Sequence, residues 1–163
     1  MQATCNSSRL HPKRIVMTNF QLLPNIEIMP RFIELCPELQ KSWDAHLKYW
    51  GEDERGDYID ISVLAHFIVD RFNEGRTESF DKIFELIEEI LNKGNAKEKE
   101  ILSLGLLEDI QNISSHTAHG YRPFEKWLGP TTRKIWIEIE KAWEGKRSLM
   151  EVVREEIKRK KTE

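Results

Sequence analysis

The apolar residues of this chain recur at helical spacing from Pro30 almost to the end, and this pattern restricts the possible folds more than any other feature. One apolar stripe, at positions i, i+4, i+8 and i+11, consists of Leu39, Trp43, Leu47 and Trp50. We find no convincing alternation of apolar and polar residues, which would indicate a β-strand. The sequence therefore predicts an all-α fold of about six helices, a bundle or a stack of antiparallel helical hairpins without a sheet.

Proline and glycine residues mark where the predicted helices begin and end. Pro37 is expected at the first position of the helix that Gly51 ends. Thr77 is expected to cap a later helix, which stops at Gly94. Three glutamates of that helix are expected to face the solvent: Glu85, Glu88 and Glu89. Towards the end of the chain, one helix is expected to begin at Pro130 and a separate, mostly polar one to cover residues 149–160.

The helix predicted over residues 96–116, with Asn95 as its N-cap, is apolar around most of its circumference. We therefore expect it to be the most buried helix of the fold. A single polar stripe interrupts its apolar surface, at i, i+3, i+4, i+7 and i+11: Gly105, Glu108, Asp109, Asn112 and His116. Such a stripe either faces the solvent, or permits close helix packing at its glycine, or lines a groove in which a partner or ligand binds.

The length and the charge distribution indicate one domain with an acidic body. The 163 residues suffice for a single hydrophobic core. Residues 1–26 lack a helical period and are expected to form a disordered or irregular leader, followed by a single helical domain over residues 27–163 with a basic C-terminal helix. Residues 27–126 contain 12 Lys and Arg against 21 Asp and Glu, whereas both ends are basic. Such an acidic body argues against nucleic-acid binding by the main fold.

The remaining composition favours a cytoplasmic protein. The chain has no apolar run of the roughly 20 residues that a membrane-spanning helix needs, and its start lacks the apolar region of a secretory signal. Its two cysteines provide neither a disulfide framework nor a zinc motif, which fits a reducing compartment. Cys36 is expected to be a buried thiol, and Trp127 and Trp136 are expected to be packing anchors.

His116 and His119 raise the question of a metal site at the end of the long helix. A metal ion would need a third ligand there, for which Glu108, His46 and His66 are the candidates. Gly120 places His119 at the frayed end of the helix, and neither an H-E-x-x-H motif nor a Glu-x-x-His motif occurs. We therefore predict no metal site and no cofactor.

A nuclease site would be built differently, around the spacing of Asn112 and His116. That spacing resembles the motif of the helical HEPN ribonucleases, but Gln111 stands where those enzymes carry an arginine. Without that cation, no residue obviously positions and neutralises a phosphate. No catalytic residue is predicted, and a metal- or His-dependent hydrolase or nuclease is kept as the alternative function.

Two runs of residues, followed by Trp143, are similar to a known kind of protein. They are G-L-L-E-D-I-Q-N-I-S-S-H at 105–116 and F-E-K-W-L-G-P-T-T-R-K-I-W at 124–136. Together with the arrangement of residues 57–95, they resemble a family of small all-helical bacterial domains of uncharacterised function, over about residues 30–145. Such domains resemble immunity proteins, which neutralise the toxins of neighbouring bacteria. The resemblance supplies no catalytic residues.

We therefore expect a non-enzymatic, cytoplasmic binding protein of the immunity type, whose acidic body docks onto a protein partner such as a basic toxin domain. One expected binding surface is an acid-rich loop with Glu52, Asp53, Glu54 and Asp57. The other is the polar stripe with Glu108, Asp109, Asn112 and His116. A helical adaptor that self-associates is a third hypothesis, because the sequence leaves the oligomeric state open.

Overall fold

The computed structural model describes the backbone of residues 28–160 and the side chains of residues 28–145. The leader expected over residues 1–26 lies outside the described residues, as do the side chains of the basic C-terminal segment. Within residues 28–160 the fold consists of α-helices with one π-helical and one 3-10 segment, and it has no strand. The prediction of an all-α fold is confirmed. None of the described helices has the length and apolar character needed to span a membrane.

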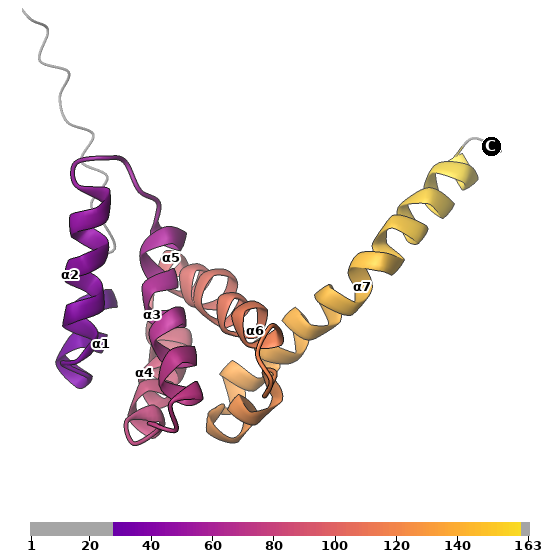
Figure 1. Ribbon diagram of the computed structural model, residues 1–163. Coiled ribbons are helices and arrows are strands. Elements are labelled where there is room, and N and C mark those ends of the chain that lie inside the picture. Colours follow the sequence, from indigo (N-terminus) through magenta and orange to yellow (C-terminus); the bar gives the residue numbers. More distant parts are fainter. Residues whose placement is uncertain (1–27, 161–163) are drawn as a thin grey trace, which may run out of the picture.

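Short connections join the helices, which follow one another along the chain as α1 (Ile28–Leu35), α2 (Leu39–Trp50), α3 (Asp57–Asn73), α4 (Phe80–Lys93), α5 (Ala96–Glu100), the π-helical η1 (Ile101–Leu107), α6 (Glu108–Ser115), the 3-10 helix η2 (Arg122–Trp127) and α7 (Pro130–Lys160). Helix α3 is central, because α2, η1 and α6 all pack against it. Helix α7 packs against α4 near its start and then extends away from the other helices (Figure 1).

The core lies between α1, α3, α4 and the segment from η1 to α6. The most buried part of the helix predicted over residues 96–116 comprises Ile101, Leu102, Leu106, Leu107 and Ile110, none more than 1% exposed. Trp136 of α7 is also 1% exposed, and Trp127 packs against Phe80 and Phe84. The prediction of two tryptophan anchors is confirmed, and Cys36 is buried as expected. The helix predicted over residues 96–116 is buried only along its middle, because α5 has no buried residue, and the central position belongs to α3.

Several predicted helix ends are confirmed. Gly51 follows the end of α2 with a φ of +56°, a conformation that glycine adopts without steric cost. Lys93 is the last residue of α4, directly before Gly94. Asn95 forms a capping box with Glu98: Asn95 Oδ1 accepts from Glu98 N at 2.9 Å, and Glu98 Oε2 accepts from Asn95 N at 2.8 Å.

Two predicted helix starts are wrong by two or more residues. Pro37 lies in a turn before α2, where its carbonyl accepts from Gln40 N at 3.1 Å, and the helix begins at Leu39. Thr77 does not cap α4 with its side chain, because the helix begins only at Phe80, whose N–H donates to the Thr77 carbonyl at 3.1 Å. In both places a single turn separates the expected boundary from the helix.

Helix α7 is one continuous helix, where the sequence predicts two. It covers Pro130–Lys160, a length of 31 residues, and includes the segment around Gly145 that separates the two predicted helices. One glycine costs a helix only about 1 kcal/mol relative to alanine, and no proline follows it. The penalty of a single residue is too small to interrupt an otherwise helical sequence.

The π-helical segment η1 replaces what the sequence predicts as continuous α-helix. A π-turn is wider than an α-turn, so residues before and after it do not keep the rotation of about 100° per residue that defines an α-helical stripe. Leu104, expected on an apolar flank, is 54% exposed. Gly105, expected on the polar stripe, is buried against Tyr58 and Ile61 of α3. The predicted stripe is therefore wrong at its first position.

Glu88 of α4, predicted to face the solvent, instead caps the start of α7. Its carboxylate accepts from the backbone N–H groups of Thr131 and Thr132, both at 2.8 Å, and from the Thr132 hydroxyl at 2.6 Å. Burial alone would raise the pKa of Glu88, but these hydrogen bonds and one from Asn92 outweigh burial and lower the pKa from 4.5 to about 2. A side chain from another helix thus satisfies the free N–H groups at this helix end.

Candidate functional site

A groove with a volume of about 480 Å³ lies where the end of α2, the beginning of α3 and η1 meet. We call it the aromatic groove. Its lining residues are His46, Tyr49, Trp50, Tyr58, Ile59, Ser62, Val63, His66, Leu104, Gly105 and Asp109. Most of them are aromatic or apolar, one is a carboxylate, and none is a lysine or arginine. A concave apolar surface with a few polar groups is the usual form of a binding site.

The aromatic walls of this groove are exposed but held in place. The rings of Tyr49 and Trp50 lie 5.9 Å apart between centroids at an interplanar angle of 83°, and Tyr49 is 83% exposed. The Tyr58 hydroxyl donates to Glu100 Oε1 at 2.7 Å, and this hydrogen bond raises the pKa of Tyr58. A Cβ on Gly105 would lie only 3.2 Å from Tyr58 Cδ1, so the glycine lets the tyrosine ring lie against η1.

The acid-rich loop connects two walls of the aromatic groove. It follows Trp50 directly and leads into α3, whose second residue is Tyr58, so both ends of the loop adjoin residues that line the groove. Its three acids are exposed and form no ion pair with a described residue: Glu52, Asp53 and Glu54. Asp57, the fourth acid predicted for this surface, is the first residue of α3 and pairs with Lys97 of α5 at 2.5 Å.

A buried carboxylate that the sequence analysis missed holds this loop in place. Asp60 is 2% exposed, and its Oδ1 accepts from His46 Nε2 at 2.7 Å and from Arg55 Nε at 2.8 Å. Arg55 belongs to the loop, His46 to α2 and Asp60 to α3, so the cluster joins three segments of the chain. Although the sequence shows an acid near a predicted helix start, nothing local indicates that Asp60 faces inward.

The structure separates the four polar residues predicted for the stripe. Asp109 lines the aromatic groove, whereas Glu108 lines a neighbouring groove of about 350 Å³ beside Lys134 of α7. Asn112 is exposed farther along α6, and His116 is exposed at the C-cap of that helix. Of the predicted binding residues, the structure therefore places only Asp109 in the lining of the aromatic groove, while Glu52, Asp53 and Glu54 lie in the loop that follows its lining residue Trp50.

Asp109 differs from the other acids around the groove in its surroundings. It is half-buried, and it makes no hydrogen bond or ion pair with another described residue. By contrast, Asp57, Asp60 and Glu100 each have a partner within the described part of the chain. A carboxylate with reduced access to water and no partner favours a nearby cation more than a fully hydrated carboxylate does.

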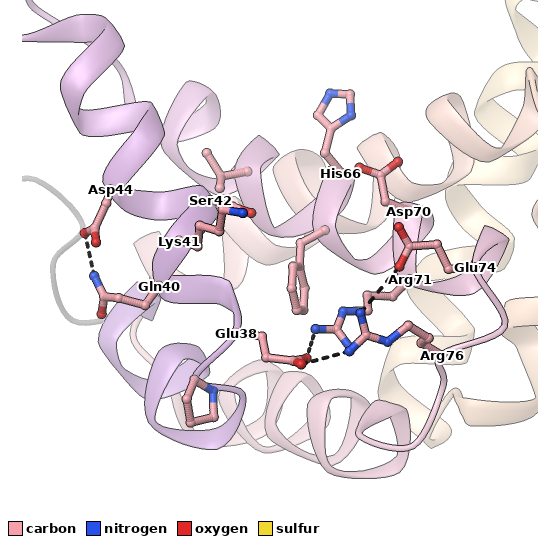
Figure 2. Close-up of a pocket in the computed structure, with 13 residues that line it drawn as sticks. Glu38, Gln40, Lys41, Ser42, Asp44, His66, Asp70, Arg71, Glu74 and Arg76 are labelled. Atoms are coloured by element: carbon pink, nitrogen blue, oxygen red, sulfur yellow. Dashed lines mark hydrogen bonds and ion pairs between the residues drawn. The ribbon is translucent and has the colours of Figure 1, made fainter.

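A larger groove of about 970 Å³ lies on the other side of His66, between α2 and α3. Figure 2 shows that two of its cations share one anion: Arg71 and Arg76 both contact Glu38, the latter at 2.8 Å. His66 and Asp70 are exposed at this groove. Because Arg71 and Arg76 already pair with Glu38, this groove is the weaker candidate for binding a charged partner.

His116 and His119, the two histidines considered as metal ligands, do not line the aromatic groove. His119 contacts the ring of Phe72 edge-on at 5.6 Å between centroids, and His116 is exposed. Within the described residues, no group of three or more His, Cys, Asp or Glu side chains could hold a metal ion.

Sequence reasoning also missed Tyr49, Tyr58 and Leu104 as parts of a site. One signal for Tyr49 was available, because this aromatic residue lies off the apolar stripe of its helix and next to Trp50. Leu104 gave no such signal, since its exposure follows from the π-helical turn. The groove offers aromatic faces, apolar edges and one carboxylate, which suits it to bind an elongated cationic group.

Comparison with known proteins identifies one family. The family model described as a domain of unknown function, DUF7674, matches residues 29–144. This range includes the aromatic groove and the acid-rich loop. No curated protein and no solved structure matches the chain.

Proposed function

The chain belongs to the DUF7674 family, and we propose that it is a non-enzymatic binding protein of the immunity type, which neutralises a toxin by direct contact. The contact surface in this proposal is the aromatic groove together with the loop acids Glu52, Asp53 and Glu54. The protein acts in the cytoplasm, where the toxin domain would otherwise reach its target.

One observation carries the proposal. Asp109 lines the aromatic groove, and the loop that carries Glu52, Asp53 and Glu54 joins two other lining residues of the same groove, Trp50 and Tyr58. Tyrosine and tryptophan are enriched at the centres of protein interfaces, because they bury a large area with little loss of conformational entropy. Exposed aromatic side chains beside unpaired acids combine an apolar anchor with a charged rim.

The charge of the body supports a basic partner. Residues 27–126 carry nine more acids than Lys and Arg. Negative potential over a docking surface speeds the encounter with a basic partner and excludes acidic ones, and added salt weakens this effect. A toxin domain that binds nucleic acid has such a basic face, and an acidic surface can occupy it in place of phosphates.

A histidine-dependent hydrolase is the second candidate, and one contact favours it. His46 lines the aromatic groove, and its Nε2 lies 2.7 Å from Asp60 Oδ1, as in a general base with its orienting carboxylate. Arg55 shares the same Asp60 oxygen, and the His46 ring stacks on Trp43 at 5.4 Å between centroids. Both contacts equally suit a structural role, so we place this function second.

The test is to co-express the chain with the toxin-like domain encoded beside its gene. We expect rescue of growth, and a complex of the two purified proteins on gel filtration. Reversing the three loop acids (Glu52→Lys, Asp53→Lys, Glu54→Lys) or replacing Asp109→Lys should weaken the growth rescue and the complex. The melting temperature of the chain should stay unchanged. Asp81→Lys on α4, an exposed acid that lines none of the three grooves described above, is the matched control.

Two results would overturn the proposal. One is a neighbouring protein that neither arrests growth nor binds the chain. The other is a complex whose affinity is the same for the reversed variants and for Asp81→Lys. A hydrolytic activity of the purified chain that disappears in His46→Ala would favour the second candidate instead.

A further inference from the structure

We propose that the aromatic groove receives an arginine side chain of the partner, whose guanidinium stacks on the exposed ring of Tyr49 or Tyr58 and pairs with Asp109. The proposal rests on the proposed function, in that the arginine is presented by a bound protein. It adds the chemical identity of the group that enters the groove.

The absence of a cation in the groove is the first argument. The groove is lined by Asp109 but by no lysine or arginine of its own. The two neighbouring grooves contain cations beside their acids, Lys134 in one and Arg71 with Arg76 in the other. In the aromatic groove, a cation that pairs with Asp109 would therefore have to come from outside the described residues.

The aromatic faces are the second argument. A cation over the face of a tryptophan or tyrosine ring is attracted by the negative charge of the π-system, by about 0.5–1 kcal/mol at an exposed site. The fold already uses this contact elsewhere, since Lys126 Nζ lies 3.9 Å from the ring centroid of Trp127 and Arg71 Cζ lies 4.9 Å from that of Phe67. Tyr49 and Tyr58 have exposed rings, and no described cation covers them.

The shape of the groove favours arginine over lysine. Its apolar edges, formed by Ile59, Val63 and Leu104, can cover the aliphatic stem of a long side chain while its head stays near Asp109. The planar guanidinium stacks on an aromatic ring and at the same time donates in its plane to a carboxylate, whereas an ammonium is a compact and strongly hydrated charge. The volume of about 480 Å³ lies within the range of sites that hold small molecules.

The experiment titrates N-acetyl-arginine methylamide into the full chain at low ionic strength and follows backbone and indole N–H resonances by NMR. We expect saturable shifts at the Trp50 indole and at the amides of Gly105 and Asp109. The uncharged citrulline analogue is the matched ligand control and should cause no saturable shift. The lysine analogue should bind more weakly than the arginine compound.

Two substitutions test the roles of the groove residues. Tyr49→Ala removes an 83% exposed ring and should weaken binding of the arginine compound about two- to fivefold. Asp109→Asn keeps the shape of the side chain, removes its charge, and should weaken binding by a similar factor. Asp81→Asn, an exposed acid on α4, should leave affinity unchanged.

The outcomes separate this inference from the proposed function. Equal affinity for the arginine and citrulline compounds, no saturation up to the solubility limit, or unaltered affinity of Asp109→Asn would each overturn the arginine pocket. If that happens while reversal of the loop acids still abolishes growth rescue, the proposed function stands without the pocket. If the arginine compound binds as expected but no toxin is neutralised, the pocket stands and the proposed function fails.

Discussion

Replacing Glu88→Gln should lower the stability of the fold by removing the charged cap of α7. Glutamine keeps the size of the side chain but has one acceptor oxygen and no charge. It therefore cannot accept from the N–H groups of Thr131 and Thr132 and from the Thr132 hydroxyl as the carboxylate does. These N–H groups lie at the positive end of a 31-residue helix, where a negative charge is favoured.

The magnitude of this loss follows from the pKa of Glu88. One pKa unit corresponds to about 1.4 kcal/mol, so a decrease from 4.5 to about 2 corresponds to about 3.4 kcal/mol as an upper limit. Because the side chain is only half-buried, water compensates for part of this energy, and we expect a loss of about 2–3 kcal/mol at pH 7. For a chain of this size such a loss lowers the melting temperature by roughly 4–12 °C.

The pH dependence provides the sharper assay. Glu88 has a lowered pKa in the folded state, so below pH 4.5 the unfolded chain binds a proton that the folded chain does not bind. Its contribution is therefore complete above pH 4.5 and disappears as the pH falls towards 2. Urea denaturation of both proteins between pH 7 and pH 2 should show a difference in unfolding free energy that narrows over this window.

The control for Glu88→Gln is Glu85→Gln on the same helix, whose side chain is exposed and forms no ion pair with a described residue. It should change the unfolding free energy by less than about 0.5 kcal/mol. The capping argument is refuted if both variants are equally stable, or if the deficit of Glu88→Gln is the same at pH 3 as at pH 7.

Two further substitutions test the walls and the anchor of the groove. Gly105→Ala should lower the free energy of unfolding by about 1–3 kcal/mol, because the new Cβ would lie 2.7 Å from Ile61 Cγ2. A variant as stable as the original chain would contradict the close packing of η1 on α3. Asp60→Ala should lower the free energy of unfolding by about 3–5 kcal/mol in denaturant titration, because it removes the buried carboxylate to which the half-buried Arg55 and His46 are bound. Asp57→Ala removes the ion pair with Lys97 and should lower the free energy of unfolding by at most about 1 kcal/mol. Equal losses for Asp57→Ala and Asp60→Ala would refute the argument that burial makes Asp60 the more important carboxylate.

The candidate site could be predicted only in part from the sequence. The acid-rich loop is visible as a run of charges after Trp50, and Asp109 is visible as a polar residue on an apolar helix. That Asp109 lines a groove with Trp50 and Tyr58, the residues on either side of this loop, depends on how η1 packs against α3, which no local pattern encodes. The predicted polar stripe also places Glu108 beside Gly105 and Asp109, whereas in the structure Gly105 and Asp109 line the aromatic groove and Glu108 lines another.

The sequence by itself determined the features that arise from neighbouring residues. The helical periodicity, the N-cap at Asn95 and the helix ends at Gly51 and Gly94 all follow from contacts within a few residues. Helical periodicity and helix capping are local effects, so a single sequence displays them.

Only the tertiary structure decided the features that join distant parts of the chain. Glu88 meets Thr131 and Thr132 across more than 40 residues, and Asp60 binds His46 from the preceding helix. The π-helical turn of η1, which packs against α3, sets which residues line the aromatic groove. These arrangements depend on how whole helices pack, and packing energy is shared among many residues that the sequence does not show to be neighbours.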